Sequence, residues 1–296
     1  MNQRESRIIN LGFIHIKESY HFGIFVMILS AVLFSANTSL VRYAKEMDVY
    51  FITFMRFFTG LVYLLILRGL HKIEFNFKNY TLLSLRGIFG ALAVLLMNIG
   101  ITKISLGKGT MLNYTYPVFA TLLAPFLNKE HNKLGTWIIQ FIALGGCWLL
   151  VMPKNGINFS PLDLIVLGGG VCAGIAVNTI RKLQKNNNTF SIFFVFCFFS
   201  CLITGVPAFS NFHMPSLFQW FILLMIGLLG TFGQLAMTYG YKMAPVNEGS
   251  LIGFLVPVLN FLISWLIFKE SLSVSVISGS ALVIVCCIIT MLRKVS

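Results

Sequence analysis

Charged residues are scarce in this 296-residue sequence: Asp, Glu, Lys and Arg make up 10% of it, against 57% hydrophobic residues. A chain of this composition cannot bury its apolar side chains in a water-soluble core, so lipid must be its solvent. Only nine residues are acidic, and no Asp, Glu or His lies in the middle of a long apolar segment. This absence argues against a proton relay through a buried carboxylate.

Motifs for catalysis and for cofactors are also missing. The sequence has no nucleotide-binding loop, no nucleophile–base pair and no zinc-ligand spacing among its six cysteines, which all lie in apolar segments. The net charge of +13 comes from basic residues placed mostly between apolar segments, where they set orientation and contact anionic lipid headgroups. We therefore expect a protein of the lipid bilayer that is not an enzyme, with no metal, no cofactor and no nucleic-acid partner.

What the sequence does contain is a series of apolar segments long enough to cross a bilayer, each of about 20 residues. The connections between them are short and hold no soluble domain. This pattern predicts an all-α polytopic membrane protein with ten transmembrane helices. The predicted spans are 22–42, 50–67, 81–101, 108–127, 134–152, 162–180, 190–209, 217–240, 246–268 and 274–292.

The polar segment 1–21 precedes the first span, which lacks a clear cleavage site and is expected to be retained. Lys and Arg in the connections are concentrated on the side of the membrane that holds this segment. The positive-inside rule then places both termini in the cytoplasm. The expected location is the cytoplasmic (inner) membrane.

The stretch from Gly109 to Glu130 returns later in the chain as Gly249 to Glu270, with six identities in 22 positions. The match extends back through the preceding span in each copy, so each half holds five spans. An odd number of spans means that the second half enters the membrane from the opposite side. The sequence therefore predicts two inverted five-helix repeats, 22–152 and 162–292, an arrangement typical of transporters.

These residues resemble the drug/metabolite transporter superfamily, in its ten-span branch with two EamA-type repeats. The resemblance is carried by Arg56 in MRFFTG, by Arg86-Gly87, and by the two motifs Gly109…Pro117-Val118…Glu130 and Gly249…Pro257-Val258…Glu270. It implies a transporter that works by alternating access and somewhat favours export. The chain departs from the family at Gly107-Lys108 and at Phe34, near where relatives meet substrate. The substrate therefore does not carry over.

Polar side chains inside the predicted spans are candidates for a substrate path. Gln234 and Thr238 share a helical face with small residues, and Asn98 lies on the matching face of the third span. Such stripes also serve close helix packing, but an amide facing lipid is costly. For Asn37 and Asn178, interhelical hydrogen bonding is the favoured alternative. The complete candidate path, in a cavity between spans 1, 3, 4, 6, 8 and 9, is Asn37, Asn98, Asn113, Tyr114, Tyr116, Asn178, Gln234 and Thr238.

Pro117 and Pro257 lie at equivalent positions of the repeat and each removes a backbone donor from its span. They are candidate hinges for alternating access, with freed carbonyls near Asn113 and Gly253 facing the cavity. The alternative is an inherited helix shape without a moving part.

Four charged residues are candidate gates or anchors. Arg56 and Arg86 lie one to two turns inside their spans, where they either snorkel to the surface or bind an anionic group or a structural carboxylate. Lys108 and Glu248 are equivalent in the repeat and should face opposite membrane surfaces without pairing. Glu130 and Glu270 are expected to be interfacial anchors or gate contacts.

We interpret the sequence as a secondary transporter that moves a small organic metabolite, such as an amino acid, a nucleotide-like metabolite or a drug-like solute. The weak association motif Gly170-x-x-x-Gly174 suits internal packing more than dimerisation, so a monomer or weak dimer is expected. Two alternatives stay open: a membrane-embedded enzyme acting on lipid, and a scaffold or sensor that transports nothing.

Overall fold

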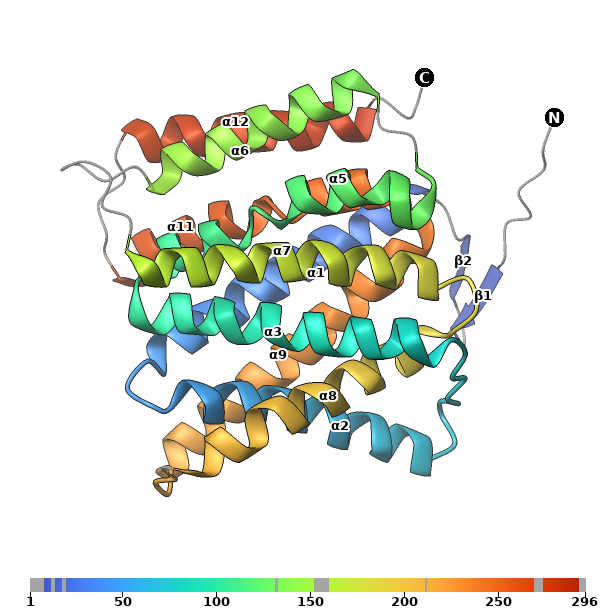
Figure 1. The fold of residues 1–296 in the computed structure, drawn as a ribbon, viewed down its shortest axis with the longest axis vertical. Coiled ribbons are helices and arrows are strands. Elements are labelled where there is room, and N and C mark those ends of the chain that lie inside the picture. Colours follow the sequence, from blue (N-terminus) through green and yellow to red (C-terminus); the bar gives the residue numbers. More distant parts are fainter. Residues whose placement is uncertain are drawn as a thin grey trace.

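The computed structural model describes residues 8–11, 14–17, 20–130, 133–151, 160–210, 212–268 and 274–292. From Tyr20 onwards these residues form helices that lie side by side in one bundle (Figure 1). The helices are α1 (Tyr20–Tyr43), α2 (Val49–Gly69), α3 (Tyr80–Lys103), α4 (Leu106–Asn113), α5 (Tyr116–Asn128), α6 (Leu134–Val151), α7 (Pro161–Leu183), α8 (Thr189–Ser210), α9 (Leu217–Met243), α10 (Val246–Ile252), α11 (Leu255–Phe268) and α12 (Val274–Leu292).

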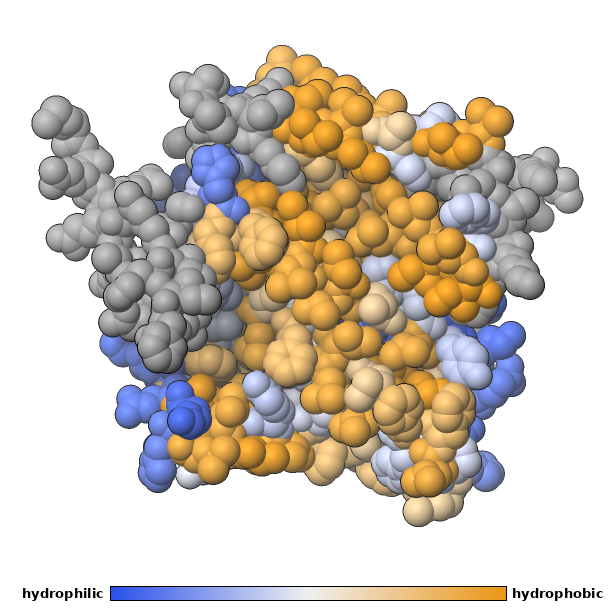
Figure 2. All heavy atoms as spheres, turned by 180° about the vertical axis from the view of Figure 1, so that it is seen from behind, coloured by the Kyte–Doolittle hydropathy of each residue, from blue (hydrophilic) through white to orange (hydrophobic). Residues whose placement is uncertain are grey.

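Length and apolar composition fit a bilayer. Within the described residues, seven helical stretches are long and apolar enough to cross a membrane, and α6 and α12 hold shorter apolar stretches. On the face shown in Figure 2, apolar residues cover the middle, and hydrophilic residues gather at the two lateral edges. Before α1, the strands β1 (Ile8–Leu11) and β2 (Ile14–Lys17) form an antiparallel hairpin. The all-helical prediction is thus confirmed for the chain after this hairpin.

Helix packing follows the sequence repeat. The contact between α1 and α9 has its counterpart in α7 and α3, and the contact between α2 and α9 has its counterpart in α8 and α3. Two further pairs, α2 with α8 and α6 with α12, join equivalent helices of the two halves. In Figure 1, α1 and α7 begin at opposite edges of the bundle. Exchanging the two halves therefore preserves the packing, as expected for inverted repeats.

The two halves also match in a detail that the sequence shows poorly. Arg42, at the end of α1, donates from Nη1 to the carbonyl of Ile101 at 2.9 Å. Arg181, near the end of α7, donates from Nη1 to the carbonyl of Tyr241 at 2.8 Å. In each half, an arginine of the first helix thus satisfies a carbonyl in the last turn of the third helix, where no intrahelical donor is available. The repeat extends to the first spans, whose sequences match only loosely.

Two predicted spans are broken near the centre of the bundle. The break between α4 and α5 falls at Tyr114 and Thr115, and the break between α10 and α11 falls at Gly253 and Phe254. Both lie two to four residues before the repeated prolines, where proline disfavours the helix. The tyrosine that opens α5, Tyr116, places its hydroxyl against Gly253. One detail of the prediction is wrong: the Gly253 carbonyl is not free, because it accepts from the Val256 amide at 3.0 Å.

Candidate functional site

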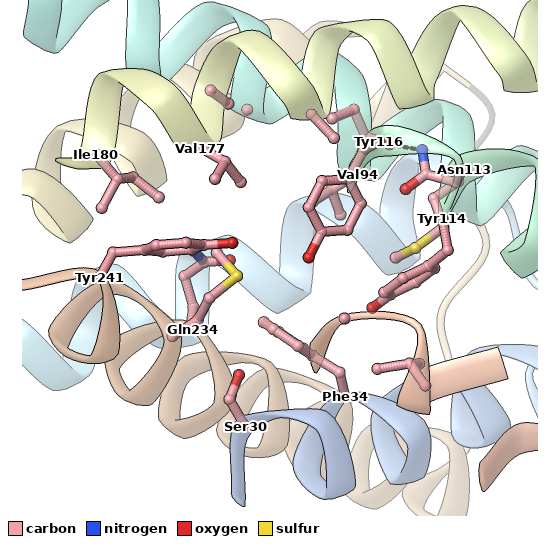
Figure 3. Close-up of a pocket in the computed structure, with 18 of the residues that line it drawn as sticks. Ser30, Phe34, Val94, Asn113, Tyr114, Tyr116, Val177, Ile180, Gln234 and Tyr241 are labelled. Atoms are coloured by element: carbon pink, nitrogen blue, oxygen red, sulfur yellow. Dashed lines mark hydrogen bonds between the residues drawn. The ribbon is translucent and has the colours of Figure 1, made fainter. Parts of the chain in front are cut away.

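A cavity lies between the two halves, beside both helix breaks (Figure 3). The centre of a water molecule can occupy about 90 Å³ of the cavity. A site for one water molecule needs about 10–15 Å³ of such volume, so the cavity is larger than a single-water site. The wall is largely apolar and aromatic, with a few polar groups, as in many small-molecule sites. Its aromatic residues are Phe34, Tyr114, Tyr116, Phe196 and Tyr241, and its main polar residues are Ser30, Arg56, Arg86, Asn113 and Gln234.

The hydroxyl groups of Tyr116 and Tyr241 point toward the same central space, and the Gln234 amide lies beside Tyr241 (Figure 3). Tyr116 comes from the first half of the chain, and Gln234 and Tyr241 come from α9 in the second half. Both halves therefore supply polar groups to one space. Arg56 on α2 and Phe196 on α8 also line the cavity, so these two helices join the six spans that the sequence placed around it.

Arg56 is buried inside the bundle, with 3% of its surface exposed. Its guanidinium carbon lies 5.7 Å from the ring centroids of both Phe34 and Phe57. The missing side chain of Gly230 makes room for it, since a Cβ atom there would lie 2.7 Å from Arg56 Nε. The side chain does not snorkel to the membrane surface. It projects into the cavity wall instead.

Arg86 has the same surroundings on α3. It is 2% exposed, and its guanidinium carbon lies 3.9 Å above the ring centroid of Phe196. Gly90, one turn later on the same helix, leaves the space that the guanidinium fills. Gly90 and Gly230 are equivalent in the repeat, so each half contributes one glycine that accommodates a buried arginine. The snorkelling alternative fails for Arg86 as well.

Neither arginine has an acidic partner in the described part of the chain. Arg56 Nη1 and Arg86 Nε are buried and make no hydrogen bond there. The structure therefore excludes one of the roles left open by the sequence, pairing with a structural carboxylate among these residues. Two cationic groups remain available to an occupant of the cavity.

Four of the eight predicted path residues lie at the cavity wall: Asn113, Tyr114, Tyr116 and Gln234. Asn113 closes α4 and donates from Nδ2 to the Ala93 carbonyl at 3.1 Å, which fixes the helix break against α3. The sequence found these residues because amide and hydroxyl groups at membrane depth need polar surroundings.

The other four predicted path residues lie outside the wall, at helix–helix contacts. Asn37 donates to the Ile226 carbonyl at 2.6 Å, and Asn98 donates to Thr53 Oγ1 at 2.9 Å. The remaining two, Asn178 and Thr238, are also buried; Asn178 donates to the Ala120 carbonyl at 2.9 Å, and the Thr238 carbonyl accepts from Gln184 at 2.8 Å. Interhelical hydrogen bonding, the favoured alternative for Asn37 and Asn178, describes their contacts.

One edge of the bundle is closed by an ion pair that the sequence did not suggest. Lys108, at the start of α4, lies 2.7 Å from Asp163 Oδ2 in the first turn of α7. The Asp163 side chain is fully buried, and it also accepts from the Ser160 amide at 2.7 Å in a capping box. Glu248, the equivalent of Lys108 in the repeat, lies instead in the first turn of α10. Lys108 ties α4 to α7.

The opposite edge is closed around Glu130, which follows α5. Glu130 Oε2 accepts from the Val246 amide at 2.9 Å, and Oε1 lies 3.5 Å from Arg181 Nε. The carboxyl of Glu248, in the first turn of α10, interacts with the Tyr20 hydroxyl at the start of α1. Contacts that join the two halves therefore exist at both edges. Glu270, the counterpart of Glu130, lies outside the described residues.

Glu130 gives this edge a pH dependence. Burial raises the pKa of its carboxyl; the Val246 amide and Arg181 oppose this, and Glu248 adds to it. The closed arrangement therefore binds a proton more tightly than an open one that exposes Glu130 to water. The closed arrangement should therefore lose stability as the pH rises from the ordinary pKa of a glutamate to the raised pKa of Glu130. Hydrogen exchange of α10, corrected for intrinsic rates, should rise with pH in the native chain and stay flat in Glu130→Gln; equal profiles would contradict this role.

Comparison with known proteins adds to this geometry. A model of the EamA-like transporter family matches the chain twice, over residues 21–152 and 160–292. The pseudopaline exporter CntI of Pseudomonas aeruginosa (strain UCBPP-PA14) is 26% identical over 269 residues, spanning 90% of this chain and 94% of that protein. The S-adenosylmethionine uptake transporter of Rickettsia bellii is 24% identical over 279 residues, spanning 90% and 92%. A solved crystal structure with 18% identity superposes with a TM-score of 0.74, covering 93% of this chain and 98% of the other, and shows the same fold.

Proposed function

The chain belongs to the EamA-like transporter family, and we propose that it moves a small organic metabolite across the cytoplasmic membrane by alternating access. As a family member it is a multi-pass membrane transporter and not an enzyme. The cavity between the two halves is the proposed binding site. The single observation that carries the proposal is its wall, to which both inverted halves contribute polar groups beside their broken helices.

Alternating access needs a site that opens to one side of the membrane at a time. The two closures, Lys108 with Asp163 and Glu130 with Arg181 and Val246, lie at opposite edges of the bundle and join different helix pairs. We propose that each breaks when its own side opens. The helix breaks before Pro117 and Pro257 would absorb the change in backbone angles, because the ladder of helical hydrogen bonds is already interrupted there.

Direction and orientation are parts of the same proposal. CntI is named as an exporter and the rickettsial proteins as uptake transporters, so relatives work in both directions. We take export, which the family resemblance somewhat favours. We place both termini in the cytoplasm because basic residues are concentrated on the side that holds them. A single chain completes the cavity, which supports a monomer as the working unit.

The proposal is tested by comparing metabolites inside and outside cells that contain or lack this protein. One or more small solutes should differ in distribution between the two strains, and purified protein in proteoliposomes should move the same solute with saturable kinetics. If no solute differs and liposomes show no flux, the protein is not a transporter of this kind.

Gln234 offers a direct test of the cavity as the binding site. Gln234→Leu keeps the size of the side chain but removes the amide from the wall, so transport of the identified solute should fall severalfold through a higher KM. The control is Leu224→Ala, at a position of the same helix that is 47% exposed toward lipid. Initial rates in proteoliposomes measure both variants. An unchanged KM in Gln234→Leu would place the binding site elsewhere.

A further inference from the structure

The cavity wall carries positive charge without negative charge. Arg56 and Arg86 line it, and no Asp or Glu is among its lining residues. A guanidinium stays protonated in proteins, so both groups are cationic at any physiological pH. The described wall therefore has two formal positive charges in a space that both halves of the protein enclose.

Such charges are costly to keep inside a membrane protein unless something pairs with them. Phe34, Phe57 and Phe196 stabilise the guanidinium faces through cation–π contacts, but these contacts leave the N–H donors at the guanidinium edges unused. The buried Arg56 Nη1 and Arg86 Nε have no hydrogen-bond partner in the described chain. The fold thus holds two donors that an anionic occupant would complete.

The two arginines flank one aromatic pair, which places them on the same side of the cavity. Arg56 lies over Phe57, Arg86 lies over Phe196, and the centroids of these two rings are 4.7 Å apart. Because Phe196 covers one face of the Arg86 guanidinium, the acceptor atoms of a ligand must approach its N–H groups in the guanidinium plane. A carboxylate fits this requirement, since it accepts two parallel N–H bonds in the guanidinium plane.

We propose that the transported solute is an organic carboxylate, with its anionic group bound by Arg56 and Arg86 and its body against the aromatic and apolar wall. This inference rests on the proposed transport function and narrows its substrate class. Figure 3 shows the space for the body between Phe34, Tyr116, Val177 and Tyr241, with Gln234 as a neutral polar contact. A purely cationic solute is excluded from this site, because it would meet two like charges and no carboxylate of the wall.

The first test measures the thermal stability of the purified full chain in detergent. Succinate, citrate and benzoate are the carboxylate probes, succinamide and benzamide are matched neutral probes, and inorganic phosphate is a further anion. At least one carboxylate should raise Tm in the native protein while its amide does not, because a ligand that binds the folded state stabilises it. The proposal is overturned if phosphate alone raises Tm, if the amides raise Tm as much as the carboxylates do, or if none of the carboxylates raises it.

The second test separates a binding role from a structural one. Arg86→Met and Arg56→Met keep the length of the side chain and remove the charge. Without ligand, both variants should be at least as stable as the native protein, because an unpaired buried charge has been removed. Their apparent Kd for the stabilising carboxylate should rise at least tenfold, and Arg86→Lys should fall between the two. Lower ligand-free Tm in both Met variants, with unchanged affinity, would make the arginines structural.

The identity of the moved solute distinguishes the two proposals. If the metabolite comparison finds a neutral or cationic solute whose transport survives in Arg86→Met, the transport function stands and the carboxylate assignment fails. If no solute moves at all, the transport function itself fails.

Discussion

Replacing Asp163 with leucine is expected to open the edge of the bundle that Lys108 closes. The substitution removes the buried carboxylate that Lys108 contacts at 2.7 Å and the acceptor of the Ser160 amide. Losing one member of a fully buried pair costs about 3–5 kcal/mol. Lys108 is 29% exposed and can reach water, so the loss should be smaller here. We expect the closed state to lose about 2 kcal/mol of stability relative to the open state, which shifts the equilibrium roughly 30-fold toward opening. Hydrogen exchange in Leu106–Asn113 should accelerate accordingly.

Two variants control this prediction. Glu46→Gln removes the acidic member of an ion pair in which Lys45 and Glu46 are 48% and 85% exposed, and exchange should not change, because such pairs contribute little. The double variant Lys108→Leu with Asp163→Leu should recover much of the protection, since apolar residues replace a buried pair without leaving a charge behind. If Asp163→Leu exchanges at the native rate, or if the double variant exchanges faster than the single one, the pair does not close this edge.

Much of the fold could be predicted because lipid imposes a simple rule on the sequence. Every span must be apolar and about 20 residues long, so the spans can be recognised in the sequence, and aligning them reveals the repeat. Proline chemistry then indicated interruptions near Pro117 and Pro257, and both helices are broken just before these residues. The sequence could not say how a freed carbonyl would be satisfied, and Gly253 accepts from Val256 in a tighter turn.

The site was harder to predict because its residues are defined by neighbours from other helices. The depth of Arg86 in its span suits both snorkelling and burial, and the contact with Phe196 that decides between them joins α3 to α8. Phe196 itself is one of 29 phenylalanines and carries no local signal. The same difficulty affects amides: Gln234 lines the cavity, whereas Asn98 bonds Thr53, and both looked equivalent on their helical faces.

Asp163 was missed for a different reason. It lies in the first turn of a helix, three residues after the N-cap Ser160, where an acidic residue normally serves the helix N-terminus and faces solvent. Its burial comes from α4, whose Lys108 lies far away in the sequence. A gate of this kind is invisible until the two short segments are placed at the same edge of the bundle.

Gly90→Ala is expected to lower the affinity for a carboxylate ligand at least tenfold while leaving the chain folded. A methyl group at Gly90 would occupy the space of the Arg86 guanidinium and would lie 2.8 Å from Phe196 Cε2. The guanidinium is the far end of a flexible side chain, so it can move at little cost in stability. The displaced Arg86 guanidinium would no longer lie over Phe196 or point into the cavity. The effect should therefore appear in Kd from thermal shifts and far less in the ligand-free Tm.

Comparison with other glycines separates this effect from the helix propensity of alanine. Gly145→Ala and Gly168→Ala add a methyl group that meets nothing within 4 Å, so they should gain about 1 kcal/mol of helix stability and keep native affinity. Gly230→Ala should lower the affinity for the ligand as Gly90→Ala does, and it should also lower Tm. Its methyl group would meet the Cγ, Cδ and Nε atoms of Arg56, which form a stiffer part of that side chain. Native affinity in both Gly90→Ala and Gly230→Ala would mean that the arginines do not bind the solute, since each variant displaces one of them by a different route.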